Sequence, residues 1–140
     1  MAATASSYLL LVRETTPEVY EAMSPDERRQ ALDRWNAWVG RMAADGRLRD
    51  GQPLQSSGRL VAGARGERVT DGPYTEAKEL VGGYFLLTDT TLEAATAIAQ
   101  QCPLLPCGMT VEIRPIAAAC HLATSLGWET MDGPARSIAD

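Results

Sequence analysis

Apolar residues form short continuous runs in three parts of the chain. Residues 8–12, Tyr-Leu-Leu-Leu-Val, are too few for a helix and apolar on both sides, which predicts a central strand covered on each face. Residues 81–88 predict a second strand, and the paired glycines Gly82 and Gly83 near its start indicate a bulge or a close backbone approach. Residues 110–114 alternate strictly between apolar and polar, which predicts a half-buried strand.

Two amphipathic helices are predicted between these strands. The first begins at Ser24, where Ser-Pro-Asp-Glu favours a capping box with Glu27, and it ends at Asp45-Gly46. Its buried stripe recurs every three or four residues and comprises Ala31, Leu32, Trp35, Trp38, Val39 and Met42. The second helix is predicted to begin with a capping box at residues 90–93 and to end before Pro103. Its inner face comprises Leu92, Ala95, Ile98, Ala99 and Cys102.

The segment between the first helix and residues 81–88 is rich in glycine and polar residues. Short apolar pieces within residues 47–68 predict a meander of two short strands. Asp71-Gly72-Pro73 then predicts a turn or loop, because these residue types favour turn conformations of the backbone.

The ends of the chain differ from its middle. We expect an N-terminal tail at residues 1–7, one domain at 8–116 and a C-terminal extension at 117–140. Residues 116–140 are alanine-rich and then polar. This composition is compatible with a short helix, an arm on a partner subunit, or a frayed terminus.

The order strand, helix, strands, helix, strand is typical of a ferredoxin-like split βαβ sandwich. It predicts an α+β fold in which two helices lie on one face of a mostly antiparallel sheet. Two helices cover only that face, yet Leu9, Leu11, Tyr84 and Leu86, or their neighbours, must point to the other. We therefore expect a second copy of the chain to cover that face in an obligate homodimer.

Composition excludes several classes of protein. The chain has 140 residues, 45% of them hydrophobic and 22% charged, which predicts one globular domain. Its formal net charge of −5 argues against non-specific nucleic-acid binding, which needs a basic field. The longest apolar runs, residues 8–12 among them, are too short to span a membrane. Residues 1–7 lack the features of a secretory signal, so we expect a cytoplasmic protein.

Cysteine and histidine are scarce. The three cysteines, Cys102, Cys107 and Cys120, are an odd number, which argues against a disulfide framework. Their spacing does not fit a zinc site, and a single histidine argues against a Ser-His-Asp or Cys-His triad. A tail residue beside a buried thiol is therefore favoured over a catalytic role for His121, and we expect neither a metal nor a cofactor.

One polar segment carries a family resemblance. Residues 71–79, Asp-Gly-Pro-Tyr-Thr-Glu-Ala-Lys-Glu, lead into Gly82-Gly83-Tyr84 and resemble the signature of the YCII-related family, also called DGPF-domain proteins, with Tyr74 in the place of the usual Phe. Further matching blocks occur in order within residues 8–116. They are the first strand, the helix with Trp35 and Trp38, Gly46, residues 51–54, Cys102-Pro103 and residues 111–115. The resemblance implies a ferredoxin-like fold that dimerises into an α+β barrel.

The resemblance implies less about activity. The family looks like small bacterial proteins of mostly unestablished function. Some branches of the wider superfamily carry a His–Asp pair proposed as acid and base. Residues 8–116 of this chain contain no histidine, so that pair does not carry over.

Four charged residues crowd the signature segment: Asp71, Glu76, Lys78 and Glu79. Such a cluster is typical of a cleft rim, where a carboxylate and an ammonium group face a small polar ligand. A structural role is favoured, in which Asp71 caps the turn and the other three pair with charges across the dimer. We keep Asp71 and Lys78 as catalytic candidates and Glu76 as a ligand-binding candidate.

Glu112 and Arg114 are the second pair of catalytic candidates. Alternation directs Val111 and Ile113 toward the helices, and it directs the charged pair into the predicted dimer barrel. There an arginine fork suits a carboxylate or a phenolate. Equally, the two residues can pair with each other, or with Lys78 and Asp71, and so lock the interface.

Three more residues are ligand-binding candidates: Arg13, Trp35 and Tyr84. Arg13 ends the first strand. Core packing is favoured over a ligand platform for Trp35. The Tyr84 hydroxyl fits a cleft and an interface hydrogen bond equally well.

Two functions follow from these residues. One is a cofactor-free acid/base lyase, isomerase or cyclase that binds a small anionic or phenolic molecule in the dimer barrel. There Asp71 or Glu112 would be the base, and Arg114 or Lys78 would stabilise negative charge. The other is a non-catalytic dimeric regulatory or ligand-sensing module. A polar, ligand-sized cavity that reaches Glu112 and Arg114 favours the first.

Overall fold

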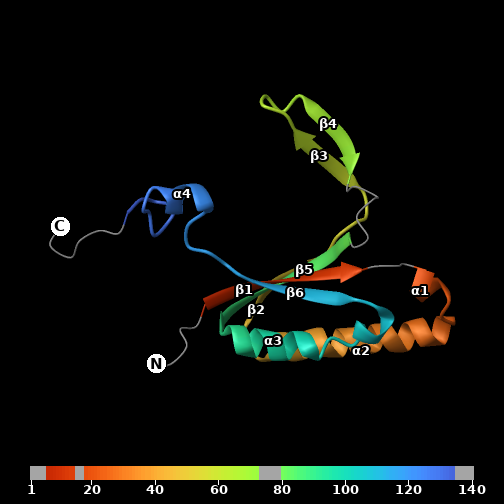
Figure 1. The fold of residues 1–140 in the computed structure, drawn as a ribbon. Helices are drawn as coiled ribbons and strands as arrows, with labels where there is room; N and C mark the ends of the chain where they lie inside the picture. Colours follow the sequence, from red (N-terminus) through yellow and green to blue (C-terminus); the bar gives the residue numbers. More distant parts are fainter. Residues whose placement is uncertain (1–5, 15–17, 73–79, 135–140) are drawn as a thin grey trace.

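The computed structural model describes residues 6–14, 18–72 and 80–134. Its main sheet has four antiparallel strands in the order β2-β5-β1-β6. The strands are β1 (Ser6–Glu14), β2 (Leu48–Pro53), β5 (Leu80–Thr90) and β6 (Thr110–Pro115). Two helices, α2 (Pro25–Ala44) and α3 (Leu92–Gln100), lie on the same face of this sheet (Figure 1). The predicted α+β class and ferredoxin-like order of elements are confirmed.

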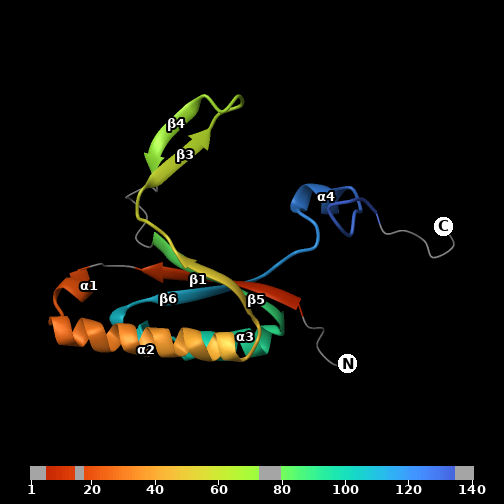
Figure 2. The same ribbon diagram turned by 180° about the vertical axis from the view of Figure 1, so that it is seen from behind.

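Smaller elements stand at the ends of this layered unit. They are α1 (Glu18–Glu21), the hairpin strands β3 (Gly58–Ala62) and β4 (Arg68–Gly72), the 3₁₀ helix η1 (Leu105–Cys107) and α4 (His121–Ser125). The β3–β4 hairpin and α4 project on the side of the sheet opposite α2 and α3, at opposite ends of it (Figures 1 and 2). No helix among the described residues is long and apolar enough to cross a membrane.

The ends of α2 follow the predicted signals. The Ser24 hydroxyl accepts from the Glu27 backbone N–H at 3.1 Å, and the Glu27 carboxylate accepts from the Ser24 N–H at 3.1 Å. The hydrogen bond that the Ser24 N–H donates to the carboxylate lowers the pKa of Glu27. At the other end Asp45 is the C-cap, and Gly46 adopts a left-handed φ of 79°. The predicted capping box and glycine stop are confirmed.

The hydrophobic core lies between the sheet and the two long helices. Trp38, Leu10 and Leu87 are its largest fully buried side chains. The Trp38 ring meets Phe85 edge-on at a centroid distance of 5.5 Å, and its indole N–H donates to the Ile98 carbonyl at 3.0 Å. This hydrogen bond ties α2 to α3 and satisfies the polar atom of the buried indole.

Both helices bury a narrower face than the spacing predicts. Leu32 is 57% exposed and Leu92 is 44% exposed, so these two residues lie at the margins of the apolar stripes. The predicted capping box at residues 90–93 is wrong, because Thr90 is buried as the last residue of β5. The helix begins one residue later, and the hydroxyl of its N-cap Thr91 accepts from the Ala94 N–H at 3.2 Å.

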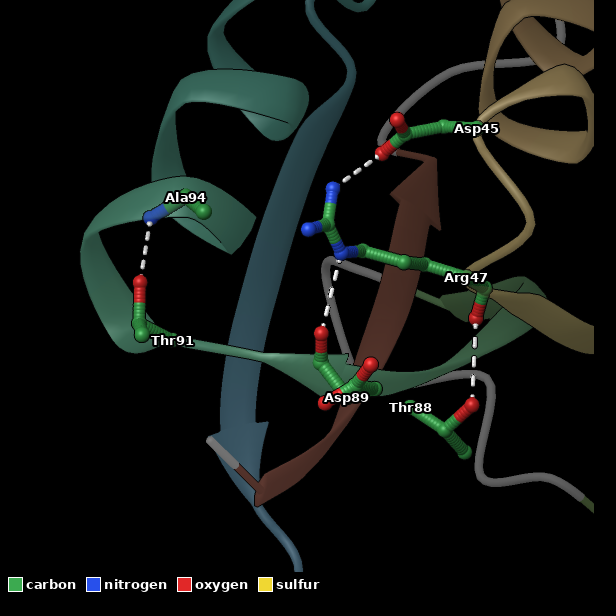
Figure 3. A network of polar contacts seen from close by, with 6 residues as sticks. All are labelled: Asp45, Arg47, Thr88, Asp89, Thr91 and Ala94. Atoms are coloured by element: carbon green, nitrogen blue, oxygen red, sulfur yellow. Dashed lines mark hydrogen bonds and ion pairs between the residues drawn. The ribbon is translucent and has the colours of Figure 1, made fainter. Parts of the chain in front are cut away.

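Arg47 joins the turn after α2 to the last residues of β5 (Figure 3). Its Nε donates to the Asp89 carbonyl at 2.9 Å, and its Nη1 binds the Asp45 carboxylate at 2.6 Å. Asp89 adopts a φ of 54°, which is unfavourable for a residue with a Cβ atom. The guanidinium therefore supports this left-handed conformation at the irregular end of β5, where the pairing with β1 shifts register between Leu87 and Thr90.

The paired glycines of β5 perform both predicted roles. Val12 of β1 stands opposite Gly83, whereas the next residue, Arg13, stands opposite Val81, so Gly82 is the extra residue of a bulge. A Cβ atom on Gly83 would lie 3.0 Å from the Gln52 carbonyl oxygen of β2. The bulge and the close backbone approach are both confirmed.

The segment from residue 47 to residue 72 confirms the prediction in part. The two short strands predicted within residues 47–68 are present as β2 and β3, but they do not pair with each other as a meander: β2 joins the main sheet and β3 pairs with a further strand, β4. The predicted turn at Asp71-Gly72 is wrong, because these residues end β4 opposite Arg59 and Gly58. Val61 and Val69 also face each other across the hairpin, so extended pairing prevails over the local turn preference. Pro73 lies outside the described residues.

The last strand and the C-terminal extension complete the chain. Val111 and Ile113 of β6 pack against the core, whereas Glu112 and Arg114 point to the opposite face, as the alternation predicts. Of the three interpretations of residues 116–140, the structure shows a short helix, α4.

Candidate functional site

A cavity of about 620 Å³ lies between α2 and the ends of β1, β2 and β5. We call it the helix–sheet cavity. Its lining is mostly apolar and includes Val12, Leu32, Trp35, Val39, Phe85 and Met109. The partly buried Trp35 ring packs on Trp38 and Phe85 at centroid distances of 5.1 and 6.0 Å, so core side chains hold it in place.

Three glycines form part of the cavity wall. A Cβ atom on Gly51 would lie 2.5 Å from the Phe85 ring. A Cβ atom on Gly82 would lie 3.0 Å from the Glu14 carboxylate, and one on Gly83 would lie 3.0 Å from a β2 carbonyl. Because no side chains extend from these glycines, the Phe85 ring, the Glu14 carboxylate and the β2 backbone can lie close to them beside the cavity.

Glu14 and Tyr20 form the polar end of the helix–sheet cavity. The Tyr20 hydroxyl, on α1, donates to Glu14 Oε1 at 3.4 Å. Burial and the nearby Glu14 charge raise the pKa of Tyr20 to about 12, so the phenol keeps its proton at neutral pH. Three further polar residues also line the cavity: Arg28, Asn36 and Gln52.

The opposite face of the sheet carries a mixture of apolar and charged side chains. We call it the open sheet face, and its residues are Leu9, Leu11, Arg13, Asp50, Tyr84, Leu86, Glu112 and Arg114. Arg13 donates from Nε and Nη2 to Glu112 Oε2 at 2.9 and 2.6 Å. Arg114 Nε lies 4.0 Å from Glu112 Oε1. Glu112 therefore serves first as the partner of Arg13.

Tyr84 forms a second polar contact on the open sheet face. Its hydroxyl donates to Asp50 Oδ2 at 2.8 Å, across the β2–β5 pair. This hydrogen bond and the Asp50 charge raise the pKa of Tyr84. The Tyr84 residue also contributes to the wall of the helix–sheet cavity.

A second cavity of about 590 Å³ lies on the open sheet face, beside the C-terminal extension. We call it the sheet–extension cavity, because Leu9 and Leu11 of β1 line one part of it and residues 114–124 line the rest. Arg114, Ile116 and the exposed Cys120 are among its lining residues. Its lining is therefore mostly apolar, with Arg114, His121 and Thr124 as its polar members.

The predicted site residues do not gather in one place. Trp35 and Tyr84 line the helix–sheet cavity, whereas Arg13 and Glu112 form an ion pair on the open sheet face. Asp71 is exposed on the hairpin and lines neither cavity. Arg114 lines the sheet–extension cavity, and the last two candidates, Glu76 and Lys78, lie outside the described residues.

Sequence reasoning missed Glu14 and Tyr20. Neither residue lies in a motif or an amphipathic stripe that the sequence shows. The four-residue helix α1 gives no periodic signal, because one turn is too short to show a repeat. In residues 18–21 an apolar and an aromatic residue lie between two glutamates, and this pattern is the local signal that indicates a helical turn.

A metal site requires several donor side chains close together. Within residues 6–14, 18–72 and 80–134, no three or more His, Cys, Asp or Glu side chains come together as a metal site. Burial raises the pKa of the Cys102 thiol, and its sulfur lies 3.6 Å from Met109 Sδ. Cys102 is therefore a core thiol rather than a reactive thiolate.

Comparison with known sequences defines the family. No curated protein matches the chain. The family model of the YCII-related domain matches residues 7–118, which include all four strands of the main sheet and both long helices. The match stops just before α4. The resemblance seen in the signature segment is thereby confirmed, and the chain belongs to the YCII-related domain family.

Proposed function

We propose that this protein binds a small organic molecule with an aromatic body and a hydroxyl or anionic group in the helix–sheet cavity. The observation that carries the proposal is a ligand-sized apolar cavity with a carboxylate and a phenol at one end. Its volume of about 620 Å³ lies within the range of roughly 300–1,000 Å³ that is typical of small-molecule sites.

Apolar contacts supply the recognition of the ligand body. Trp35 offers a large, rigid surface, and its packing against Trp38 and Phe85 fixes its orientation before the ligand arrives. A flat aromatic ring fits such a wall better than a flexible chain, because it loses little conformational freedom on binding.

Polar contacts supply the orientation of the ligand. Glu14 would accept a hydrogen bond from a ligand hydroxyl, while Tyr20, still protonated, would donate one to a ligand oxygen. Arg28, which lines the same cavity, would pair with an anionic substituent. These three residues therefore select for phenolic or anionic aromatic ligands.

The same arrangement supports acid–base chemistry without a cofactor. Glu14 would take a proton from the bound molecule, and the Tyr20 hydroxyl would stabilise the oxygen on which negative charge develops. Glu14 replaces Asp71 and Glu112 as the proposed base, because Glu112 is engaged by Arg13 and Asp71 lines neither cavity. The alternative function is ligand sensing, in which the molecule is bound and released unchanged.

We also propose that the protein works as a homodimer through the open sheet face. The half-buried Leu9, Leu11 and Leu86 form an apolar centre that α2 and α3 do not cover. The Arg13–Glu112 pair would become buried in the dimer without losing its mutual partners. An isologous contact between two copies covers both faces at once.

The ligand proposal is tested with a panel of phenols and naphthols, each matched with its analogue that lacks the hydroxyl. Binding is measured by thermal shift and by titration of tryptophan fluorescence. We expect Trp35→Ala to weaken binding of both series at least tenfold. Tyr20→Phe should weaken only the hydroxyl series. Trp128→Ala is the matched control, because Trp128 lies in the C-terminal extension and should leave binding unchanged.

Other outcomes contradict the proposal in distinct ways. Binding that Arg114→Ala abolishes and Trp35→Ala spares would place the ligand on the open sheet face instead. Absence of binding by the whole panel would refute the ligand class. For compounds that bind, turnover lost in Glu14→Gln supports the enzyme, whereas binding with no product formed supports the sensor.

A further inference from the structure

We propose that the β3–β4 hairpin of one copy docks into the sheet–extension cavity of a second copy. The proposal rests on the homodimer proposed above and adds to it a specific contact, in which the hairpin of each subunit meets the C-terminal extension of the other. Val61 and Val69 would fill the apolar part of the cavity, and Asp71 would pair with Arg114.

The hairpin needs a partner for its own stability. Among the strands that the structure describes, its two five-residue strands pair only with each other, and nearly every residue from 58 to 72 is exposed. Val61 and Val69, directly opposite each other, are 68% and 53% exposed. An isolated two-stranded ribbon is marginally stable in water, so an apolar contact on this ribbon would be stabilising.

The sheet–extension cavity offers a matching surface. Leu9 and Leu11 form its floor, and Ile116 of the extension is 48% exposed beside it. Arg114 stands at its edge with a side chain that is 67% exposed. The one carboxylate near that guanidinium, within the described residues, already accepts two hydrogen bonds from Arg13. Arg114 can therefore accept an additional carboxylate partner.

Symmetry brings the two surfaces together. The hairpin and the extension project from the same side of the sheet, at opposite ends (Figures 1 and 2). A two-fold axis perpendicular to the strands, through the open sheet face, places the hairpin of one copy over the extension end of the other. Sheets that pack face to face lie about 10 Å apart, and a five-residue strand spans roughly 17 Å. The hairpin is thus long enough to reach the level of the partner's sheet.

Charge supports the same pairing. On the hairpin, Asp71 and Val69 are two residues apart and share a face, and Arg59 stands directly opposite Asp71, so a carboxylate and a guanidinium both adjoin the valine pair. In the cavity a guanidinium adjoins the leucine pair. Docking therefore matches apolar with apolar and sets Asp71, rather than Arg59, against Arg114, so that Asp71 and Arg114 act as an interface lock.

A crosslinking experiment tests the contact with a cysteine that the chain already has. Cys120 is exposed and lines the sheet–extension cavity. Val61→Cys in the full chain should form a disulfide with Cys120 of the second copy under mild oxidation by diamide. The product is a covalent dimer on a non-reducing gel, and it should disappear in Val61→Cys with Cys120→Ala. Gln100→Cys, on the exposed side of α3, is the matched control and should give no dimer through Cys120.

A charge exchange gives an independent measurement. Asp71→Arg and Arg114→Asp should each raise the dimer dissociation constant about tenfold, because each change affects two symmetry-related contacts. The double variant should return it to near the wild-type value. Asp33→Arg, on the exposed side of α2, controls for net charge and should leave it unchanged.

The outcomes separate this contact from the dimer itself. A protein that remains dimeric but gives neither the crosslink nor the charge rescue refutes the hairpin contact and leaves the homodimer standing. A monomer in sedimentation refutes both. A disulfide within one chain, seen as a fast-migrating monomer, would show that the hairpin folds back on its own extension and would also overturn the proposal.

Discussion

Tyr20 and Glu14 illustrate how single residues acquire chemistry from their surroundings. They lie six positions apart, and the intervening residues 15–17 are outside the described part of the chain. Their contact brings a phenol into the field of a carboxylate, which disfavours the phenolate. The result is a hydrogen-bond donor that persists at high pH, at the polar end of an otherwise apolar cavity.

The pKa of Tyr20 predicts a pH-dependent stability. The unfolded tyrosine loses its proton near pH 10, whereas folded Tyr20 keeps it until about pH 12. The unfolded state therefore binds fewer protons between pH 10 and pH 12, and the free energy of unfolding falls as the pH rises through this window. Urea unfolding should show a steeper fall for the wild type than for Tyr20→Phe. Parallel curves for the two proteins would contradict the assignment.

At the scale of elements, the same residue type has opposite roles in a helix and in a strand. Gly40 lies within α2, where a Cβ atom would meet nothing within 4 Å. Gly51 lies within β2, where a Cβ atom would meet the Phe85 ring at 2.5 Å. The glycine of the helix therefore only weakens it, whereas the glycine of the strand allows the close contact beside the helix–sheet cavity.

Alanine at these two positions should change stability in opposite directions. Gly40→Ala should raise the free energy of unfolding by about 0.5–1 kcal/mol, because alanine loses less backbone entropy in a helix. Gly51→Ala should lower it by about 1–3 kcal/mol, since the new methyl group overpacks against the Phe85 ring. Urea denaturation of both variants is the measurement. A stabilising Gly51→Ala would mean that the ring moves aside at little cost.

The whole molecule is asymmetric across its sheet. One face of the sheet packs against α2 and α3 and forms the core. The other is the open sheet face, and the hairpin and α4 project beside it (Figure 1). A sheet that exposes leucines and a partly shielded ion pair on one side is typical of an assembly interface. The hairpin and the extension then become parts of an assembly rather than isolated projections.

Arginine at position 11 should convert the dimer into a monomer. Leu11 lies near the middle of the open sheet face, so Leu11→Arg would place two like charges at the centre of an isologous interface. Sedimentation velocity at micromolar concentration should show the wild type as a dimer and the variant as a monomer. Leu92→Arg, at an exposed position of α3, is the control and should stay dimeric. A monomeric wild type would contradict the proposed assembly.

Local sequence signals predicted local structure well. The Ser24 capping box and the alternation of residues 110–114 depend on neighbours within a few positions, and both are confirmed. The turn expected at Asp71 failed, because its backbone pairs with Arg59, twelve residues away. The partner of Glu112 could not be found either, since Arg13 precedes it by 99 residues. Such contacts depend on strand order and register, which no short motif encodes.

The sequence by itself determined the family, the order of elements and the side of the sheet to which Glu112 and Arg114 point, because these follow from short spacings and from a polar signature. Only the tertiary structure decided which groups meet. In the folded chain Glu14 accepts a hydrogen bond from Tyr20, and Glu112 accepts one from Arg13. Asp71 lies on a separate hairpin, away from both pairs. The physical reason is that side-chain chemistry acts over a few ångströms in space, whereas the spacing of residues along a chain fixes distance only within one helix, strand or turn.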